Sequence, residues 1–139
     1  MSVETFVDTN VLIYAHDKEA GEKRERALEE LRELWERHSG ALSTQVLQEF
    51  YVNVTRKIPK PLKRATAREI IERYGEWHLV VPDHRLVIDA TKLEQRKRIS
   101  FWDAMIIVAA QWSGAKTLLT EDLNDGQEFG PVTIRNPFI

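Results

Sequence analysis

Residues 100–119, SFWDAMIIVAAQWSGAKTLL, contain a complete helix–turn–strand unit. Ser100 is a favoured helix N-cap, the apolar run that follows predicts a helix over residues 101–113, and Gly114 occupies the position where many helices end. Nearly every face of this helix is apolar, which is typical of a helix buried on all sides. Lys116–Leu119 then predicts a short buried strand. This stretch therefore predicts a helix packed against a central sheet.

Strands and helices alternate in the rest of the chain as well. The other predicted strands cover residues 3–7, 41–42, 77–81 and 132–135, and the other predicted helices cover residues 10–15, 21–38, 44–56, 65–75 and 84–97. This alternation predicts an α/β fold whose parallel strands are joined by right-handed crossovers. A length of 139 residues corresponds to one domain, which we expect to span residues 1–139.

Composition excludes several classes of protein. The chain is 42% apolar and 30% charged, as expected of a globular protein and not of a disordered one. It has no cysteine, which excludes disulfides, thiol chemistry and cysteine-ligated zinc. The first ten residues lack the basic and apolar regions of a signal peptide, and the longest uncharged stretch, residues 104–115, is too short to span a bilayer. We therefore expect a cytoplasmic protein.

Charge is unevenly distributed although the net charge is only −2. Residues 56–98 carry 12 basic and 6 acidic side chains, whereas both flanking segments are acidic. A basic middle between acidic ends suits a protein that holds a cation and receives a polyanion. Chance segregation of solvated faces would give the same pattern, so charge alone leaves both interpretations open.

Two acids stand at positions that invite a functional interpretation. Asp8 follows the first predicted strand, and sites in open α/β sheets form at the carboxyl ends of strands. Asp103 is the only charged residue between Arg98 and Lys116, and an unpaired buried carboxylate is costly. The alternatives are structural: Asp8 is also a good helix N-cap, and Asp103 could form a capping box with Ser100.

Further acids lie on a helix and in a turn. Glu49 falls at the edge of the apolar stripe of the predicted 44–56 helix, and residues 120–126 form an acid-rich turn directly after a predicted strand. Each is individually explained as a solvated side chain or a turn former. If Asp8, Glu49, Asp103 and the turn converge, mutual repulsion requires a cation, and Mg²⁺ or Mn²⁺ is the natural one for oxygen ligands. Such sites act on phosphodiesters.

Several segments together resemble the PIN-domain ribonucleases, and most closely the VapC-type toxins of bacterial and archaeal type II toxin–antitoxin pairs. The segments are Asp8-Thr9-Asn10-Val11-Leu12, Ser43-Thr44-Gln45-Val46-Leu47-Gln48-Glu49-Phe50, Trp102-Asp103-Ala104, Thr120-Glu121-Asp122 and the closing Asn136-Pro137-Phe138. Their order and spacing match over essentially the whole chain. The resemblance implies an α/β, three-layer PIN-like fold with a short central parallel sheet flanked by helices.

The resemblance also implies roles for individual residues. Asp8, Glu49 and Asp103 match the family's regular catalytic, metal-binding acids, and Asp122 matches a fourth acid that varies more. Asp125 is a neighbouring candidate metal ligand; because the family often has Asp-Phe where this chain has Asp125-Gly126, the resemblance leaves open whether Glu121, Asp122 or Asp125 completes the site. The polar positions that would orient carboxylates and waters are Thr9, Asn10, Ser43 and Thr44.

The activity implied by the resemblance is Mg²⁺- or Mn²⁺-dependent hydrolysis of single-stranded RNA. Attack by an external water would leave a 5′-phosphate and a 3′-hydroxyl. The implied partners are a cognate antitoxin protein and a second copy of the chain, with DNA bound only indirectly through the antitoxin. The candidate RNA contacts in the basic middle are Arg56, Lys57, Lys60, Lys63, Arg64, Arg96, Lys97 and Arg98.

Other functions fit the sequence less well. A phosphatase with an aspartate nucleophile needs a second acid two residues after Asp8, where this chain has Asn10, and no GxxxxGK[ST] phosphate loop is present. Two alternatives remain open: a stand-alone PIN nuclease in RNA processing, and a non-catalytic PIN-like module that binds RNA or protein. We expect Trp77, Trp102 and Trp112 to be core or subunit contacts.

Overall fold

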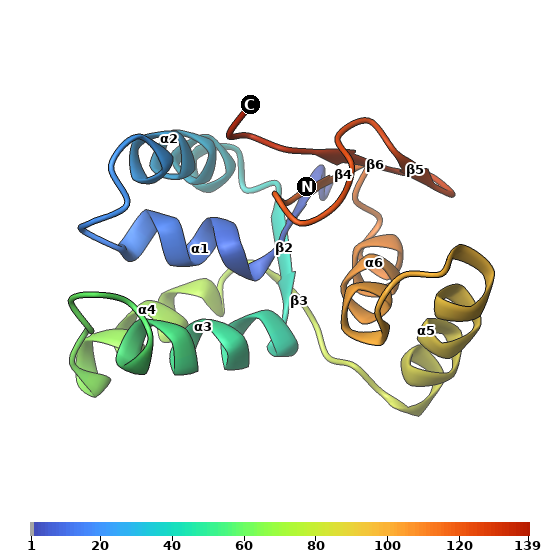
Figure 1. Ribbon diagram of the computed structural model, residues 1–139, viewed down its shortest axis with the longest axis horizontal. Coiled ribbons are helices and arrows are strands. Elements are labelled where there is room, and N and C mark those ends of the chain that lie inside the picture. The colour runs from blue at the N-terminus through green and yellow to red at the C-terminus, as the bar shows by residue number, and fades with distance from the viewer. Residues whose placement is uncertain (1) are drawn as a thin grey trace.

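The fold is a sheet held between two groups of helices, as a computed structural model that describes residues 2–139 shows (Figure 1). Six strands in the order β3-β2-β1-β4-β6-β5 form the sheet. In Figure 1 helices α5 and α6 lie on one side of the sheet and α1 to α4 on the other. The elements are β1 (Thr5–Val7), α1 (Thr9–His16), α2 (Glu22–Arg37), β2 (Gly40–Ser43), α3 (Thr44–Arg56), α4 (Arg64–Tyr74), β3 (His78–Val80), α5 (His84–Lys97), α6 (Phe101–Ser113), β4 (Thr117–Leu119), β5 (Glu128–Phe129) and β6 (Val132–Arg135).

The predicted order of strands and helices and the three-layer class are confirmed. Helix α6 begins after a Ser100 cap, whose hydroxyl accepts from the backbone N–H of Asp103, and ends at Gly114 with φ of 83°. The predicted parallel sheet carries one additional, antiparallel strand at its edge. Strand β5, which the sequence analysis missed, pairs antiparallel with β6. Two residues are too few to show the alternating pattern by which a strand is recognised.

The parallel register brings the chain segments after β1 and β4 together. Strand β1 lies between β2 and β4, and Val7 is the register partner of Leu119. The backbone N–H of Asp8 continues the ladder by donating to the carbonyl of Leu119 at 3.0 Å. Phe6, Val7 and Leu119 are fully buried beneath this edge. The residues that follow the two strands, Asp8 and Thr120, are therefore held side by side on a rigid base.

Helix α6 is less completely buried than its sequence predicted. Its central residues from Ala104 to Ala110 are buried, but Trp102 is 63% exposed and Trp112 is 42% exposed. The expected core position is correct only for Trp77; a subunit contact stays a prediction for the other two. Among residues 2–139, no helix combines the length and the apolar composition needed to cross a membrane.

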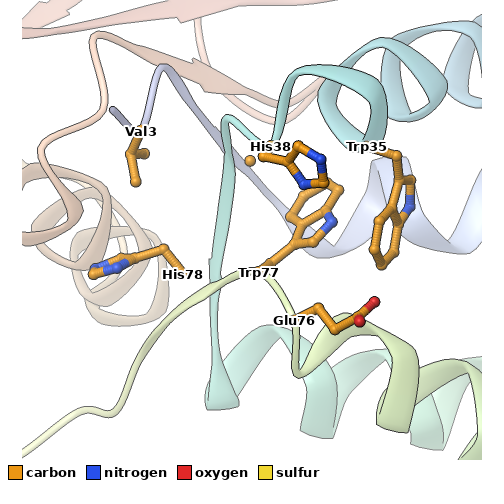
Figure 2. Close-up of a pocket in the computed structure, with 7 residues that line it drawn as sticks. Val3, Trp35, His38, Glu76, Trp77 and His78 are labelled. Carbon is orange, nitrogen blue, oxygen red and sulfur yellow. The ribbon is translucent and has the colours of Figure 1, made fainter. Parts of the chain in front are cut away.

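At the amino ends of β2 and β3, away from the candidate acids, lies a hollow of about 410 Å³. Trp35 and Trp77 line it in Figure 2, beside the exposed side chains of His38 and Glu76. The Trp35 and Trp77 rings meet edge to face with centroids 5.3 Å apart. A Cβ at Gly40 would lie 2.5 Å from the Trp77 ring, so glycine lets the indole pack directly on β2.

Gly40→Ala should lower the free energy of unfolding by about 1–3 kcal/mol, because the methyl group has no space beside a buried ring. Urea denaturation measures this cost. In a Trp77→Phe background the same substitution should cost less, since the smaller ring leaves room. An equal cost in both backgrounds would contradict the proposed packing.

Candidate functional site

Asp8 is the buried centre of the candidate site. It is the N-cap of α1, and its Oδ1 accepts from the backbone N–H of Thr9 at 2.7 Å. Its Oδ2 accepts from the hydroxyl of Thr120 at 2.9 Å. Only 6% of the residue is exposed. Asp8 therefore caps α1, as the structural alternative predicts. Its other carboxylate oxygen, Oδ2, is directed toward the turn after β4.

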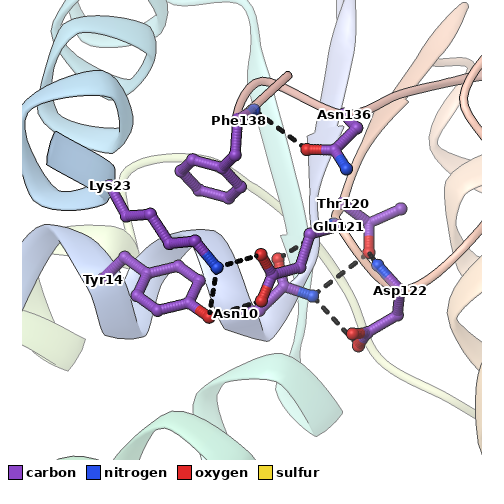
Figure 3. Close-up of polar contacts among 8 residues, drawn as sticks. All are labelled: Asn10, Tyr14, Lys23, Thr120, Glu121, Asp122, Asn136 and Phe138. Carbon is purple, nitrogen blue, oxygen red and sulfur yellow. Dashed lines mark hydrogen bonds and ion pairs between the residues drawn. The ribbon is translucent and has the colours of Figure 1, made fainter.

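Asn10, in the first turn of α1, connects this helix to the turn after β4 (Figure 3). Its Nδ2 donates to the Thr120 hydroxyl at 3.1 Å and to Asp122 Oδ2 at 3.0 Å. Its Oδ1 accepts from the backbone N–H of Glu121 at 3.3 Å. One amide therefore holds the turn beside α1 and places the Asp122 carboxylate next to Asp8.

Thr9 connects the same edge to α3. Its hydroxyl donates to Glu49 Oε1 at 2.7 Å, while its backbone N–H is bonded to Asp8. Glu49 is partly buried and lies in the middle of α3, which packs against α1. Contrary to the simple surface interpretation, Glu49 is fixed near Asp8 by the first residue of α1.

Asp103 completes the group from the other side of the sheet. It lies in the first turn of α6 and is partly buried. Burial, and in smaller measure the charge of Asp122, raises the pKa of this carboxyl. The charge of Asp122 also raises the pKa of Asp8. Asp122 is therefore close enough to both Asp8 and Asp103 to affect their ionisation.

The side chains of the three acids in the turn after β4 point in different directions. Asp122 faces Asn10 and the other acids. Glu121 is turned toward α1 and α2, where it accepts from Tyr14 and Lys23. Asp125 accepts from the backbone N–H of Asn136 at 2.8 Å, at the C-terminal segment. Of the three acids that the sequence left open, this arrangement favours Asp122.

The remaining predicted polar residues have other positions. Ser43 is buried and caps α3 by accepting from the backbone N–H of Val46 at 3.4 Å. Thr44 lines a shallow groove between α3 and α4. Within residues 2–139, no hydrogen bond joins either hydroxyl to a candidate acid. These two residues therefore support the placement of α3, on which Glu49 lies.

Thr120 is the residue that sequence reasoning missed. It is fully buried, and its hydroxyl donates to Asp8 while accepting from Asn10 and from the backbone N–H of Asp122 at 3.1 Å. All its hydrogen-bonding capacity is used. A hydroxyl residue directly after a buried strand and two positions before an acid was the available signal.

A cleft of about 490 Å³ opens beside these groups. Its lining comprises Thr9, Asn10, Ile13, Gln48, Glu49, Val52, Asn53, Lys57 and Asp122. Helices α1 and α3 form its walls, and Lys57 stands at the C-terminal end of α3. Of the predicted basic contacts, Lys57 is the one that shares this cleft with the acids. Lys60 is instead paired with Glu19 at 3.0 Å.

The surroundings of Asp8 strongly favour its protonated form. Its pKa is raised from 3.8 to about 7, chiefly by burial and in smaller measure by the charges of Asp122 and Glu49, while the hydrogen bonds from Thr9 and Thr120 act in the opposite direction. Among residues 2–139, none of the groups that shift this pKa is cationic. The donor set is all oxygen, as Mg²⁺ and Mn²⁺ prefer, so these residues fit a divalent ion chemically. Within residues 2–139, no three acidic or histidine side chains are already arranged around one point as metal ligands.

Stability of the metal-free protein should fall as the pH rises. The folded state keeps the Asp8 proton up to about pH 7, whereas the unfolded chain releases it near 3.8. Between these values the folded state binds the extra proton, so the free energy of unfolding decreases by up to about 1.4 kcal/mol per pH unit. Urea denaturation in a chelator measures this slope.

The contribution of Asp8 is isolated by comparison with variants. Asp8→Asn should flatten the slope between about pH 4 and about pH 7. Asp125→Asn, outside the cluster, should retain it. An unchanged slope in Asp8→Asn would show that Asp8 does not carry the raised pKa.

Comparisons with known proteins identify the family and the fold. The PIN domain family matches residues 5–124. A search of curated protein sequences found no significant match. Among solved structures, the chain is similar to a toxin–antitoxin complex from Klebsiella pneumoniae, at 21% identity and a TM-score of 0.70, covering 97% of this chain and 98% of that one.

Two further solved structures share the fold. One is the sarcin–ricin loop cleaving toxin VapC20 of Mycobacterium tuberculosis, at 18% identity and a TM-score of 0.63, covering 83% of this chain and 87% of that one. The other is VapBC2 of Rickettsia felis bound to a promoter DNA fragment, at 20% identity and a TM-score of 0.65, covering 98% of both chains. With the family match over most of its length, the chain belongs to the PIN domain family.

Proposed function

We propose that this protein is a metal-dependent endoribonuclease of the VapC toxin type, which hydrolyses single-stranded RNA. The observation that carries the proposal is that Glu49 and Asp122 lie close enough to Asp8, and Asp122 close enough to Asp103, for their charges to act on one another, although the four acids come from four separate segments. Membership of a family of nucleases supports it. The proposed site lies at the carboxyl edge of the sheet, where open α/β sheets bind ligands.

The four acids would hold Mg²⁺ or Mn²⁺; Asp125 is the less favoured candidate, because its Oδ1 is turned toward the backbone N–H of Asn136. When bound, such an ion activates water and stabilises charge on the phosphate oxygens. The hydrogen bonds from Thr9 and Asn10 use Glu49 Oε1 and Asp122 Oδ2, so the second oxygen of each carboxylate could reach an ion while these bonds are kept. Water would attack phosphorus and the bond to the 3′ oxygen would break, which leaves a 5′-phosphate and a 3′-hydroxyl.

RNA would lie along the cleft and contact basic side chains on both sides of the acids. Lys57 lies in the cleft itself. Arg96, Lys97 and Arg98 are exposed at the end of α5, a few residues before Asp103. Arg56, Lys63 and Arg64 are exposed at the ends of α3 and α4, farther along the same segment. Each would contribute by neutralising phosphate.

The proposed partners are a cognate antitoxin and a second copy of the chain. Solved structures with this fold include toxin–antitoxin complexes, two of them bound to DNA. We propose that DNA reaches this protein only through an antitoxin and that it acts in the cytoplasm. Exposed apolar side chains suit a subunit contact: Val81, Val87, Ile88, Trp102 and Trp112.

Asp8→Asn and Asp103→Asn should each reduce Mn²⁺-dependent cleavage of a single-stranded RNA by about 100-fold or more. Gel assays with end analysis measure both rate and products, and Asp125→Asn serves as the matched control with activity retained. Metal-independent cleavage, or a 2′,3′-cyclic phosphate among the products, would contradict the proposal. A folded wild type that binds RNA without cutting it would instead identify a non-catalytic module.

Lys57→Gln should weaken RNA binding and reduce the slope of log affinity against log salt by about 0.7, the value for one phosphate of a single strand. Fluorescence anisotropy with Asp8→Asn protein measures this without cleavage. Lys60→Gln is the comparison, because Glu19 already pairs with Lys60, and it should change the slope less. Equal slopes for Lys57→Gln and wild type would place RNA outside this cleft.

A further inference from the structure

Glu121 belongs to a second polar cluster, beside the acids but separate from them (Figure 3). Its Oε1 accepts from the Tyr14 hydroxyl, and its Oε2 accepts from Lys23 Nζ at 2.9 Å. Lys23 also donates to the Tyr14 hydroxyl at 3.3 Å. Three elements meet here, because Tyr14 lies on α1, Lys23 on α2 and Glu121 in the turn after β4.

The C-terminal segment covers this cluster. The Phe138 ring meets the Tyr14 ring edge to face with centroids 5.1 Å apart, and Lys23 Nζ lies 4.8 Å from the Tyr14 centroid and 5.7 Å from that of Phe138. The Glu121 side chain is only 21% exposed. Partial removal from water strengthens an ion pair relative to a fully exposed one.

Glu121 directly precedes Asp122, so a contact that fixes Glu121 also restrains Asp122. The backbone N–H of Glu121 donates to Asn10 Oδ1, and the next residue, Asp122, receives the amide of the same Asn10. Glu121, the one residue between buried Thr120 and Asp122, is thus fixed at its side chain by α1 and α2. Without that attachment, Asn10 and Thr120 would be the residues within 2–139 whose hydrogen bonds hold the exposed Asp122.

We propose that Tyr14, Lys23 and Glu121 form a clamp that fixes the turn after β4, so that Glu121 positions Asp122 and does not itself bind the ion. The inference rests on the proposed function, because it assigns Asp122 to the metal site. It makes Glu121, Tyr14 and Lys23 positioning residues, and gives the C-terminal Phe138 the role of shielding their contacts.

Mn²⁺ titration by calorimetry tests the clamp on Glu121→Ala, Tyr14→Phe and Lys23→Met proteins whose circular dichroism is native. Each should raise the Mn²⁺ dissociation constant, by about 10- to 100-fold for Glu121→Ala, without changing the number of ions bound. Arg37→Gln, which breaks an exposed pair at the other end of α2, is the control and should leave the constant unchanged.

A double-mutant cycle separates positioning from direct ligation. If Glu121 acts through Asp122, then Glu121→Ala should have little further effect in an Asp122→Asn background. If Glu121 were itself a ligand, the two losses would add, and Tyr14→Phe and Lys23→Met would free it and leave Mn²⁺ binding intact or stronger. Either result would overturn the clamp.

Hydrogen exchange of the metal-free protein supplies a readout that does not depend on the ion. Exchange of residues 120–126 should be faster in the three clamp variants than in wild type and Arg37→Gln. Unchanged exchange overturns the clamp. If exchange quickens but wild type binds no Mn²⁺, the clamp of the turn stands while its role at a metal site and the proposed function both fail. If wild type and all clamp variants bind Mn²⁺ equally, the proposed function stands and the clamp fails.

Discussion

Repulsion between the buried Asp8 carboxylate and the less buried acids around it is the constraint on which the rest of this structure depends. Asp8 is almost inaccessible and lies within the field of Glu49 and Asp122. Protein interiors tolerate such groups when they are protonated, hydrogen-bonded or paired with a cation. In the metal-free chain the first two solutions operate, through a pKa near 7 and the donors of Thr9 and Thr120. The third is the one a nuclease would use.

The fold accounts for how distant acids come to share this edge. Parallel pairing of β1 with β4 sets the residues after both strands next to each other, and α1 and α3 pack side by side so that Thr9 reaches Glu49. Helix α6 contributes Asp103 from the opposite layer. Asp8 and Asp103 therefore lie at helix starts and Glu49 on the side of α3 that faces α1, while Asp122 lies in the turn after β4. Packing of the apolar core therefore fixes the positions of the elements that carry the acids.

Local signals made much of this predictable from sequence. Ser100 and Gly114 mark both ends of α6 because capping and left-handed backbone depend on single residue types. Asp8 was recognisable because it ends a strand. The three acids of the turn could not be separated, since only the directions of their side chains distinguish Asp122 from Glu121 and Asp125. Those directions are set by Asn10, Lys23 and Asn136, which are distant in the chain.

Tertiary context also decided what the sequence did not predict. Thr120 reads as an ordinary strand-end residue until Asp8 and Asn10 are placed around it. Trp102 follows a helix cap in an apolar segment, yet the absence of a covering element in residues 2–139 leaves it exposed. The position of an indole in a first helical turn is not fixed by its apolar character, because the packing partner decides it.

Crystals grown or soaked with Mn²⁺ would test the central claim most directly. The account predicts an anomalous-scattering peak at oxygen-ligand distance from carboxylates of Asp8 and Asp122, on the side that Glu49 and Asp103 face, with Glu121 still held by Tyr14 and Lys23. A fully occupied peak bound instead by Glu121 or Asp125, or no peak at this edge while the protein cleaves RNA with Mn²⁺ present, would contradict it.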